Sequence, residues 1–257
     1  MSSLFTTLRI LARIICLLGL AAAMAGCSAI KLGYNTLPEF AYWWLDGYVD
    51  FTDAQGPRAR EDLARLQQWH RTQELEKYAE LLHKVELLAP AQLNAEQVCG
   101  VVKEIRDRLQ AVAEHAEPAL VTLALGLAPE QLQHLERKYT KNSAAYRKEW
   151  VSLAPADSAE KRFKQVLERS EMIYGNLDEP QLVILRQQIE QSAFDAKVIF
   201  ADRQRRHQDA LATLRKLAGQ PVSMDEARRF MRGLVERWQE SPDPTYRAWQ
   251  EALIQEG

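Results

Sequence analysis

Cysteine is scarce in this chain of 257 residues, which contains only three. We expect Cys16 to be removed with an N-terminal segment and Cys27, directly after that segment, to be modified. Cys99 then stands alone in the mature chain. An internal disulfide is therefore excluded, although an oxidising compartment would permit one. Because Cys99 lies at the margin of an apolar helical stripe, we predict a buried and unreactive thiol.

The sequence also lacks the short motifs by which many enzymes are recognised. It contains no glycine loop of the kind that cradles phosphate, no Gly-x-Ser-x-Gly turn and no cysteines paired at metal-binding spacing. Glu80 and His83 match half of the Glu-x-x-His motif of two-metal sites in helical bundles, but no other histidine has a carboxylate three residues before it. We therefore predict no metal site and no cofactor.

Positive charge is not concentrated either. The formal net charge is −2, and it becomes −4 once Arg9 and Arg13 leave with the N-terminal segment, which contains no acidic residue. A weakly acidic protein has no electrostatic footprint for nucleic acid, so nucleic acid is not predicted as a partner.

Residues 1–26 have the features of a secretory signal peptide. Arg9 and Arg13 precede an apolar run that begins at Ile14, and small residues end the segment. The apolar run is too short for an ordinary membrane-spanning helix. We therefore exclude these residues from the folded domain.

The segment ends in Met24-Ala25-Gly26-Cys27, which resembles the lipobox of bacterial lipoproteins, although Met24 stands where leucine is usual. By that resemblance, Cys27 is diacylated and becomes the new N-terminus. The residue after Cys27 is Ser28 and not aspartate, which by the same resemblance implies sorting to the outer membrane of a Gram-negative cell. There the acyl chains would hold the protein at the periplasmic face. A plain signal peptide with an incidental cysteine is the alternative.

The densest aromatic stretch, FAYWWLDGYVDF, runs from Phe40 to Phe51. A helix over residues 38–53 would gather four aromatic side chains in one apolar stripe, those of Phe40, Trp44, Tyr48 and Phe51. The other side would carry Tyr42, Trp43 and the carboxylates of Glu39, Asp46, Asp50 and Asp53. Helices that lie on membranes usually offer lysine and arginine to anionic head groups. We therefore expect the stripe to dock on the protein's own helices, and a position in the membrane interface is the alternative.

The remaining sequence is helical almost throughout, because helix-forming residues dominate and strand-like alternation is absent. A helix-start pattern, with Gln or Glu three positions after a cap residue, occurs at Asn94, Ala128, Asp178 and Ser223. The predicted helices cover residues 57–88, 95–115, a short segment from Pro118, 129–150, 158–174, 179–191, 196–218, 224–239 and 244–253.

These elements predict an all-α fold, a compact multi-helix bundle of antiparallel packed helices. Residues 27–37 would form a tether and residues 38–257 a single domain. A candidate subdomain break lies near 154–157, where Pro155 interrupts the helices.

Several segments resemble an uncharacterised family of Gram-negative bacterial lipoproteins, defined only as a domain of unknown function. The most specific is the YWWLDGYVDF block after the lipobox cysteine; the others are Trp69-His70-Arg71, Gln97-Val98-Cys99, Tyr174-Gly175-Asn176-Leu177 and Arg203-Gln204-Arg205-Arg206. The resemblance covers nearly all of the mature chain. It implies a lipid-anchored helical protein that faces the periplasm, and it supplies no catalytic residues.

Polar residues within two apolar stripes are the candidates for a buried network or pocket. His70 and Glu74 lie four apart in the helix over 57–88, and Arg203 and His207 lie four apart in the helix over 196–218. An unpaired charge in a core costs several kcal/mol, so we expect Arg203 to pair with a carboxylate. The candidate partners are Glu74, Asp46 and Asp50. A structural network that fixes helix docking is the first interpretation, and a ligand or catalytic pocket is the alternative.

These features favour a non-enzymatic envelope protein that binds a partner or scaffolds an assembly at the outer membrane, and no catalytic residue is assigned. Its partners would be the membrane, through acyl chains on Cys27, and an envelope protein or ligand whose identity the sequence does not specify. One alternative is a carrier of a small amphipathic ligand held between helices, and a less favoured one is a cell-envelope hydrolase.

Overall fold

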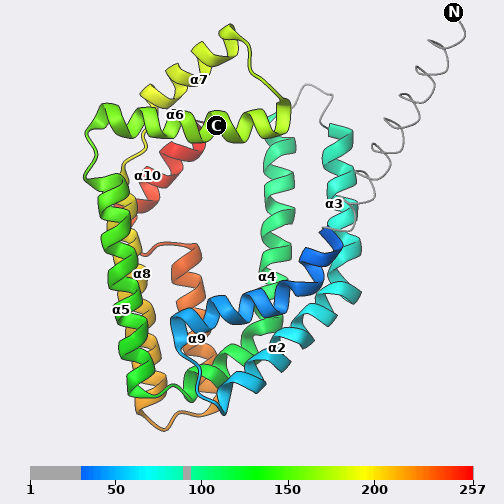
Figure 1. Ribbon diagram of the computed structural model, residues 1–257, viewed down its shortest axis with the longest axis vertical. Helices are drawn as coiled ribbons and strands as arrows, with labels where there is room; N and C mark the ends of the chain where they lie inside the picture. The colour runs from blue at the N-terminus through cyan, green and yellow to red at the C-terminus, as the bar shows by residue number, and fades with distance from the viewer. Residues whose placement is uncertain (1–29, 89–93, 257) are drawn as a thin grey trace, which may run out of the picture. The chain divides into compact units, whose positions relative to one another are not determined.

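The computed structural model describes residues 30–88 and 94–256 (Figure 1). Every regular element in these residues is a helix, so the predicted all-α fold is confirmed. The predicted signal peptide 1–26 and the predicted lipidation site Cys27 lie outside the described residues.

Contacts along the backbone divide the chain into two compact units, Met1–Ala116 and Glu117–Gly257. The division falls inside the long helix α4 (Ala95–Leu125). The connection at 154–157, which the sequence suggests as a subdomain break, lies within the second unit.

Helix α4 continues through Pro118, where the sequence predicts the start of a separate helix. A proline inside a helix removes one backbone donor and costs about 3 kcal/mol. Immediately beyond it, Val121 and Ala124 are buried in the core of the second unit. Packing of this last turn offsets the cost of the proline, which local sequence alone does not reveal.

The described part of the first unit starts with a helix over residues 30–49, which extends upstream of the predicted start at Pro38. A long helical run follows, made of α2 (Gln55–Trp69), a single π turn η1 (His70–Glu74) and α3 (Leu75–Leu88). The sequence predicts one helix over nearly the same residues. The π turn inserts an extra residue into it, so the side chains before and after the turn face in slightly different directions.

The helix over 30–49 lies against α2 through residues that the sequence placed on its polar side. The ring of Tyr42 stacks on Phe51 at 5.4 Å between centroids, and the guanidinium carbon of Arg60 lies 3.5 Å from the Tyr42 ring centre. The exposed fractions of Phe40 and Trp44 are 62% and 51%. The prediction that the stripe docks on the protein's own helices is therefore wrong for Phe40 and Trp44, whereas Tyr48 and Phe51, the other members of the stripe, are partly buried.

The prediction of a buried thiol at Cys99 is also wrong, because Cys99 is exposed. It belongs to a stripe on α4 whose apolar members are themselves open, with exposed fractions from 41% to 60% at Val98, Val102, Ile105 and Leu109. An apolar helical stripe predicts burial only where a second element covers it.

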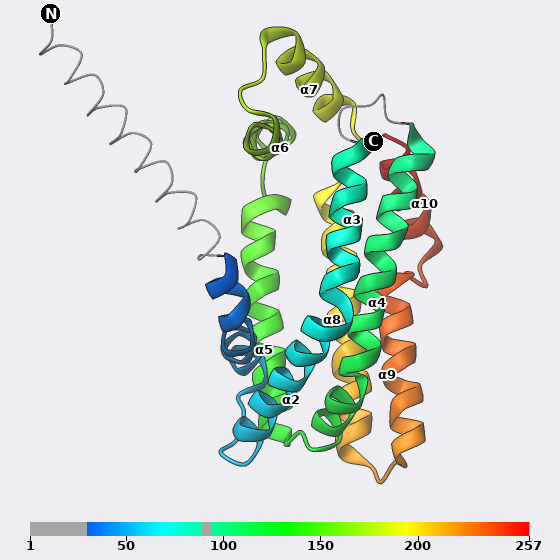
Figure 2. The ribbon, with the colours of Figure 1, turned by 90° about the vertical axis from the view of Figure 1, so that its right-hand side faces the viewer.

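The second unit contains the end of α4 and the following elements: α5 (Pro129–Tyr146), η2 (Arg147–Val151), α6 (Pro155–Tyr174), α7 (Glu179–Gln191), α8 (Ala196–Gly219), α9 (Met224–Gln239) and α10 (Pro244–Gln255). Helix α8 is central, because α5 and α9 both pack along it (Figure 2). A tightly buried cluster joins α4, α8 and α9 and consists of Val121, Ala124, Leu217 and Ala227. Helices α5 and α8 thus lie side by side along their length.

Three of the predicted helix starts, those at Asn94, Asp178 and Ser223, are confirmed by their cap geometry. Asn94 accepts the Gln97 N–H at 2.9 Å and donates its own N–H to the Gln97 side chain at 3.1 Å. Asp178 closes the same reciprocal pair with Gln181, and Ser223 accepts the N–H of Glu226. These bonds depend on neighbours in sequence, which is why the pattern could be recognised without a structure.

Candidate functional site: the groove between α5 and α8

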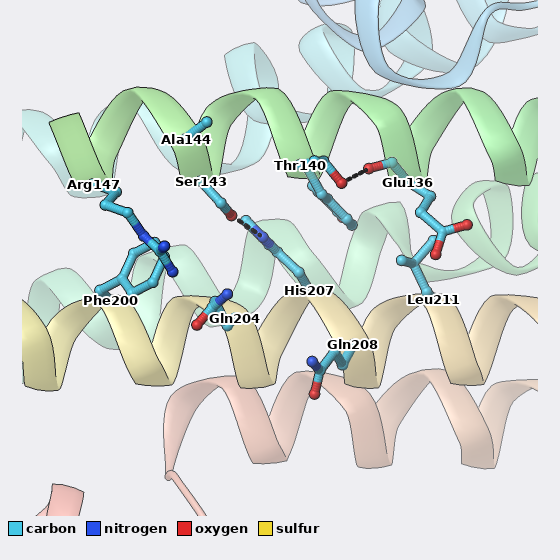
Figure 3. Close-up of a pocket in the computed structure, with 11 residues that line it drawn as sticks. Glu136, Thr140, Ser143, Ala144, Arg147, Phe200, Gln204, His207, Gln208 and Leu211 are labelled. Carbon is cyan, nitrogen blue, oxygen red and sulfur yellow. Dashed lines mark hydrogen bonds between the residues drawn. The ribbon is translucent and has the colours of Figure 1, made fainter.

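A groove of about 370 Å³ runs between α5 and α8 in the second unit (Figure 3). Ser143 and Thr140 contribute to one wall, and Phe200, Gln204 and His207 contribute to the other. Residues three and four apart on a helix share a face, which is how each helix presents a row of side chains to the groove. The volume falls within the range of about 300–1,000 Å³ that is usual for ligand sites.

His207 is held inside the groove by contacts with α5. Its ring lies parallel to that of Tyr139, with centroids 4.0 Å apart and an interplanar angle of 0°. Its Nδ1 lies 3.4 Å from the hydroxyl oxygen of Ser143 (Figure 3). With its own proton on Nε2, the neutral ring accepts a hydrogen bond from Ser143 at Nδ1.

Burial lowers the pKa of His207 below its ordinary value, and the positive charge of Arg203 lowers this pKa further. Both effects oppose protonation, since each makes the imidazolium form less favourable. His207 is therefore neutral at pH 7 and acts in the groove as an aromatic hydrogen-bonding group.

The neutral state of His207 predicts a stability that falls in mild acid. Below about pH 6.5 the unfolded chain takes up a proton that the folded chain does not, so the free energy of unfolding decreases from there down to the folded-state pKa. Because the ring is only partly buried, we expect a loss of at most about 1 kcal/mol. Urea unfolding of the wild-type protein and of His207→Gln between pH 7.5 and 5.5 measures this difference. Parallel pH profiles for the two proteins would contradict the assignment.

Arg203 lies one turn before His207, and its partner within the second unit is an aromatic ring. Its guanidinium carbon is 4.9 Å from the centre of the Tyr146 ring, and its Nε is buried without a hydrogen-bond partner among the described residues. Desolvation raises the pKa of Tyr146 above its ordinary value. The contact that the structure gives Arg203 is a cation–π interaction inside the second unit, and the carboxylates expected as its partners, Glu74, Asp46 and Asp50, belong to the first unit.

The carboxylate nearest in sequence, Asp202, is already paired on another side of α8. It is 6% exposed, and its two oxygens accept from Arg205 Nε at 2.8 Å and Arg206 Nε at 2.5 Å. The hydroxyl of Ser241, which precedes α10, donates to Asp202 at 3.2 Å. Asp202 thus joins α8 to the segment that enters α10.

Sequence reasoning did not select Asp202, Ser143 or Tyr139. A signal for Asp202 existed, because Arg205 and Arg206 follow it at three and four residues, the spacings that bring helical side chains together. Ser143 and Tyr139 gave no comparable signal, since a hydroxyl or a tyrosine on a helix is usually a surface or packing residue.

In the first unit, Glu74 is 2% exposed and is paired twice. Its carboxylate accepts from Lys77 Nζ at 2.6 Å and from Arg108 Nη1 of α4 at 3.3 Å. The hydrogen bond from Lys77 is the main cause that lowers the pKa of Glu74. Glu74 therefore fixes the end of the π turn to α4, and Lys77 and Arg108, its two partners, both lie in the first unit.

His70, at the start of the same π turn, contacts the helix over 30–49. Its Nδ1 lies 3.0 Å from the hydroxyl of Tyr34, and its ring centre is 5.3 Å from that of Tyr78. His70 and Glu74 thus mark the two ends of η1 and attach it to different neighbouring helices.

Asp46 and Asp50 lie where the helix over 30–49 ends. The Asp46 side chain accepts the N–H of Phe51 at 2.9 Å, and its carbonyl accepts the N–H of Asp50 at 2.8 Å. Asp50 has a φ of 56°, the left-handed conformation that aspartate tolerates better than most residues. The structure therefore places these carboxylates in a helix-terminating turn.

The groove geometry suits binding better than acyl transfer. Ser143 lies within α5, where backbone N–H groups are used by the hydrogen bonds of the helix. An acyl-transfer site needs such donors aimed at a developing oxyanion. Within residues 30–88 and 94–256, moreover, no three His, Cys, Asp or Glu side chains converge in a metal-binding arrangement.

A family model described as a family of unknown function, DUF6279, matches residues 47–240. The chain belongs to this family. The match includes the groove, Asp202 and Glu74, and it begins inside the aromatic block, so the family model does not reach Cys27 or most of the helix over 30–49. No curated protein and no solved structure gives a significant match. In the part of the chain that the structure describes, no helix has the length and hydrophobicity to span a bilayer.

Proposed function

We propose that this DUF6279 protein is a lipid-anchored binding protein of the Gram-negative envelope, attached through Cys27 to the periplasmic face of the outer membrane. The lipobox-like sequence before Cys27 supports the anchor, and Ser28 supports the outer membrane as its destination. The observation that carries the binding role is the groove between α5 and α8.

The lining of this groove indicates what it binds. His207 is uncharged and stacked on Tyr139, Phe200 is an apolar wall, and Gln204 offers both a donor and an acceptor. Glu136 and Arg147 also line the groove, so it offers one charge of each sign beside its aromatic contacts and neutral hydrogen bonds. An exposed segment of another envelope protein can match all of these. The groove lies on two long packed helices, so it is held in shape before a partner arrives.

A small amphipathic ligand is the second candidate for the same groove. The volume of about 370 Å³ would hold part of such a molecule, with its apolar portion against Phe200 and Leu211 and its polar portion at Gln204. Because both candidates use the same residues, they are separated by the identity of what is bound.

Photo-crosslinking in intact cells tests this proposal. A photoreactive residue at Gln204 is expected to give a protein adduct, and the same residue at the exposed Gln187 of α7 is expected to give none of that mass. Ala144→Trp, which places a large ring in the groove mouth, should reduce the adduct about ten-fold. A lipid adduct at Gln204 would instead support the carrier. Equal products from Gln204 and Gln187 would overturn the groove as a binding site.

A further inference from the structure

The helix over residues 30–49 leaves one half of its surface open. Six large apolar side chains are between 49% and 79% exposed: Ile30, Leu32, Leu37, Phe40, Trp43 and Trp44. At about 100° per residue, these six positions fall within an arc of roughly 160°. We call them the open face of this helix.

The open face contains no charged residue. The charged side chains of the helix, those of Lys31, Glu39 and Asp46, fall outside the arc. Glu39 lies 3.6 Å from Arg60 of α2, and Asp46 is occupied by the N–H of Phe51. The carboxylates that would be repelled by an anionic membrane therefore lie off the open face, and one of them is paired with an arginine.

The opposite side of the helix is already used. Tyr34 contacts His70, and Asn35 accepts a hydrogen bond from Arg71 at 2.6 Å. Tyr42 lies beneath the guanidinium of Arg60. These contacts attach the helix to the helical run after it and turn the open face away from that run.

Chain length keeps the open face close to the predicted anchor. Three residue steps separate Cys27 from Ile30, a reach of at most about 11 Å at full extension. From Ile30 to Trp44 the helix rises by about 21 Å. If acyl chains on Cys27 are in the bilayer, the whole face stays within about 32 Å of the attachment point, which is enough for the helix to lie along the surface.

We infer that the open face of the helix over 30–49 binds the surface of the membrane that holds the acyl chains of Cys27, an inference that rests on the proposed lipid anchor. Tryptophan and phenylalanine are favoured in the interfacial region, where an amphipathic helix buries its apolar side by about 5–10 Å. The face has no lysine or arginine, so the attraction is hydrophobic. The helix thereby holds the first unit of the protein against the bilayer, and the acyl chains need not act alone.

Fluorescence quenching by brominated lipid tests this inference on the full acylated protein. Reconstituted into vesicles of phosphatidylethanolamine and phosphatidylglycerol that contain brominated phosphatidylcholine, the wild-type protein should lose tryptophan fluorescence. Trp43→Phe/Trp44→Phe should abolish that loss, whereas Trp238→Phe, on α9, should keep it. The quenching should change little between about 0.1 and 0.5 M salt, because no basic side chain supplies the attraction.

A second measurement separates this inference from the anchor itself. The chain from Ser28 onward, exported without acylation, should still bind the same vesicles, and Trp43→Ser/Trp44→Ser should weaken that binding about ten-fold or more. Both substitutions are on exposed positions, and unchanged helical circular dichroism verifies the fold.

Fatty-acid labelling of Cys27 without bromolipid quenching would overturn the open-face inference while the anchor stands. Quenching without labelling would overturn the anchor and support the face. A third outcome is that neither bromolipid nor, in bromine-free vesicles, aqueous acrylamide quenches the fluorescence of Trp43 and Trp44. That result would mean that a protein partner covers the open face.

Discussion

Replacing Cys27 with serine is expected to abolish incorporation of labelled fatty acid and to leave an uncleaved precursor. Acylation uses the thiol of the cysteine at the end of the lipobox, and a serine hydroxyl is a much weaker nucleophile at neutral pH. The expected loss of label is therefore complete. Metabolic labelling with palmitate, followed by gel analysis of the immunoprecipitated protein, measures both effects.

Cys99 provides the matched control, because it is the only other cysteine expected in the mature chain and is exposed on α4. Cys99→Ser should retain the label and the processing of the wild-type protein. Undiminished labelling of Cys27→Ser would remove the lipid anchor from the proposed function. Loss of the label in Cys99→Ser would instead show that Cys99, on α4, is the acylated residue.

Asp202→Ala is expected to lower the free energy of unfolding of the second unit by about 2–4 kcal/mol. The substitution removes an acceptor for Arg205, Arg206 and Ser241; both guanidinium groups lose their carboxylate, and Arg205 keeps the carbonyl of Arg237. Removing one member of a fully buried ion pair costs about 3–5 kcal/mol. The range is lower here because the side chains of Arg205 and Arg206 are 24% and 31% exposed, so water replaces part of the lost interaction.

Urea unfolding followed by circular dichroism measures the effect, with Glu136→Ala as the control. Glu136 also pairs with an arginine, Arg215, but both side chains of that pair are 50% exposed. Exposed pairs contribute about 0–1 kcal/mol, so the control should differ little from the wild-type protein. Equal effects of Asp202→Ala and Glu136→Ala would show that the buried network does not stabilise the unit.

Helix boundaries could be predicted closely from sequence because they depend on neighbours along the chain. Asp178 and Ser223 cap α7 and α9, and both helices begin and end where the sequence predicts. The exceptions are the first helix, which spans 30–49 and not 38–53, α6, which begins at Pro155 and not at 158, and Pro118. At Pro118 the packing of Val121 and Ala124 overrides the local preference of proline to begin a helix. That packing involves Leu217 and Ala227, far away in sequence.

The candidate site was predicted only in part. His207 was selected from its place in the stripe of α8, and it lies in the groove. Its neighbours Ser143 and Tyr139 could not be selected, because nothing in the sequence states that α5 packs beside α8. The cost of burying a charge predicts a carboxylate partner for Arg203, whereas in the second unit the face of Tyr146 lies against the guanidinium. An aromatic ring is a partner that a search for opposite charge overlooks.

Residue order alone was enough to establish the all-α class, most helix ends, the lipobox-like segment and the scarcity of metal-binding and catalytic motifs. These properties depend on composition and on spacings of three or four residues, which a linear sequence displays. Tertiary structure decided which side of an amphipathic helix is covered. The helix over 30–49 has aromatic residues on both sides, and only its contact with Arg60 and His70 leaves Trp43 and Trp44 open. Burial depends on which element lies opposite, and that element comes from a distant part of the chain.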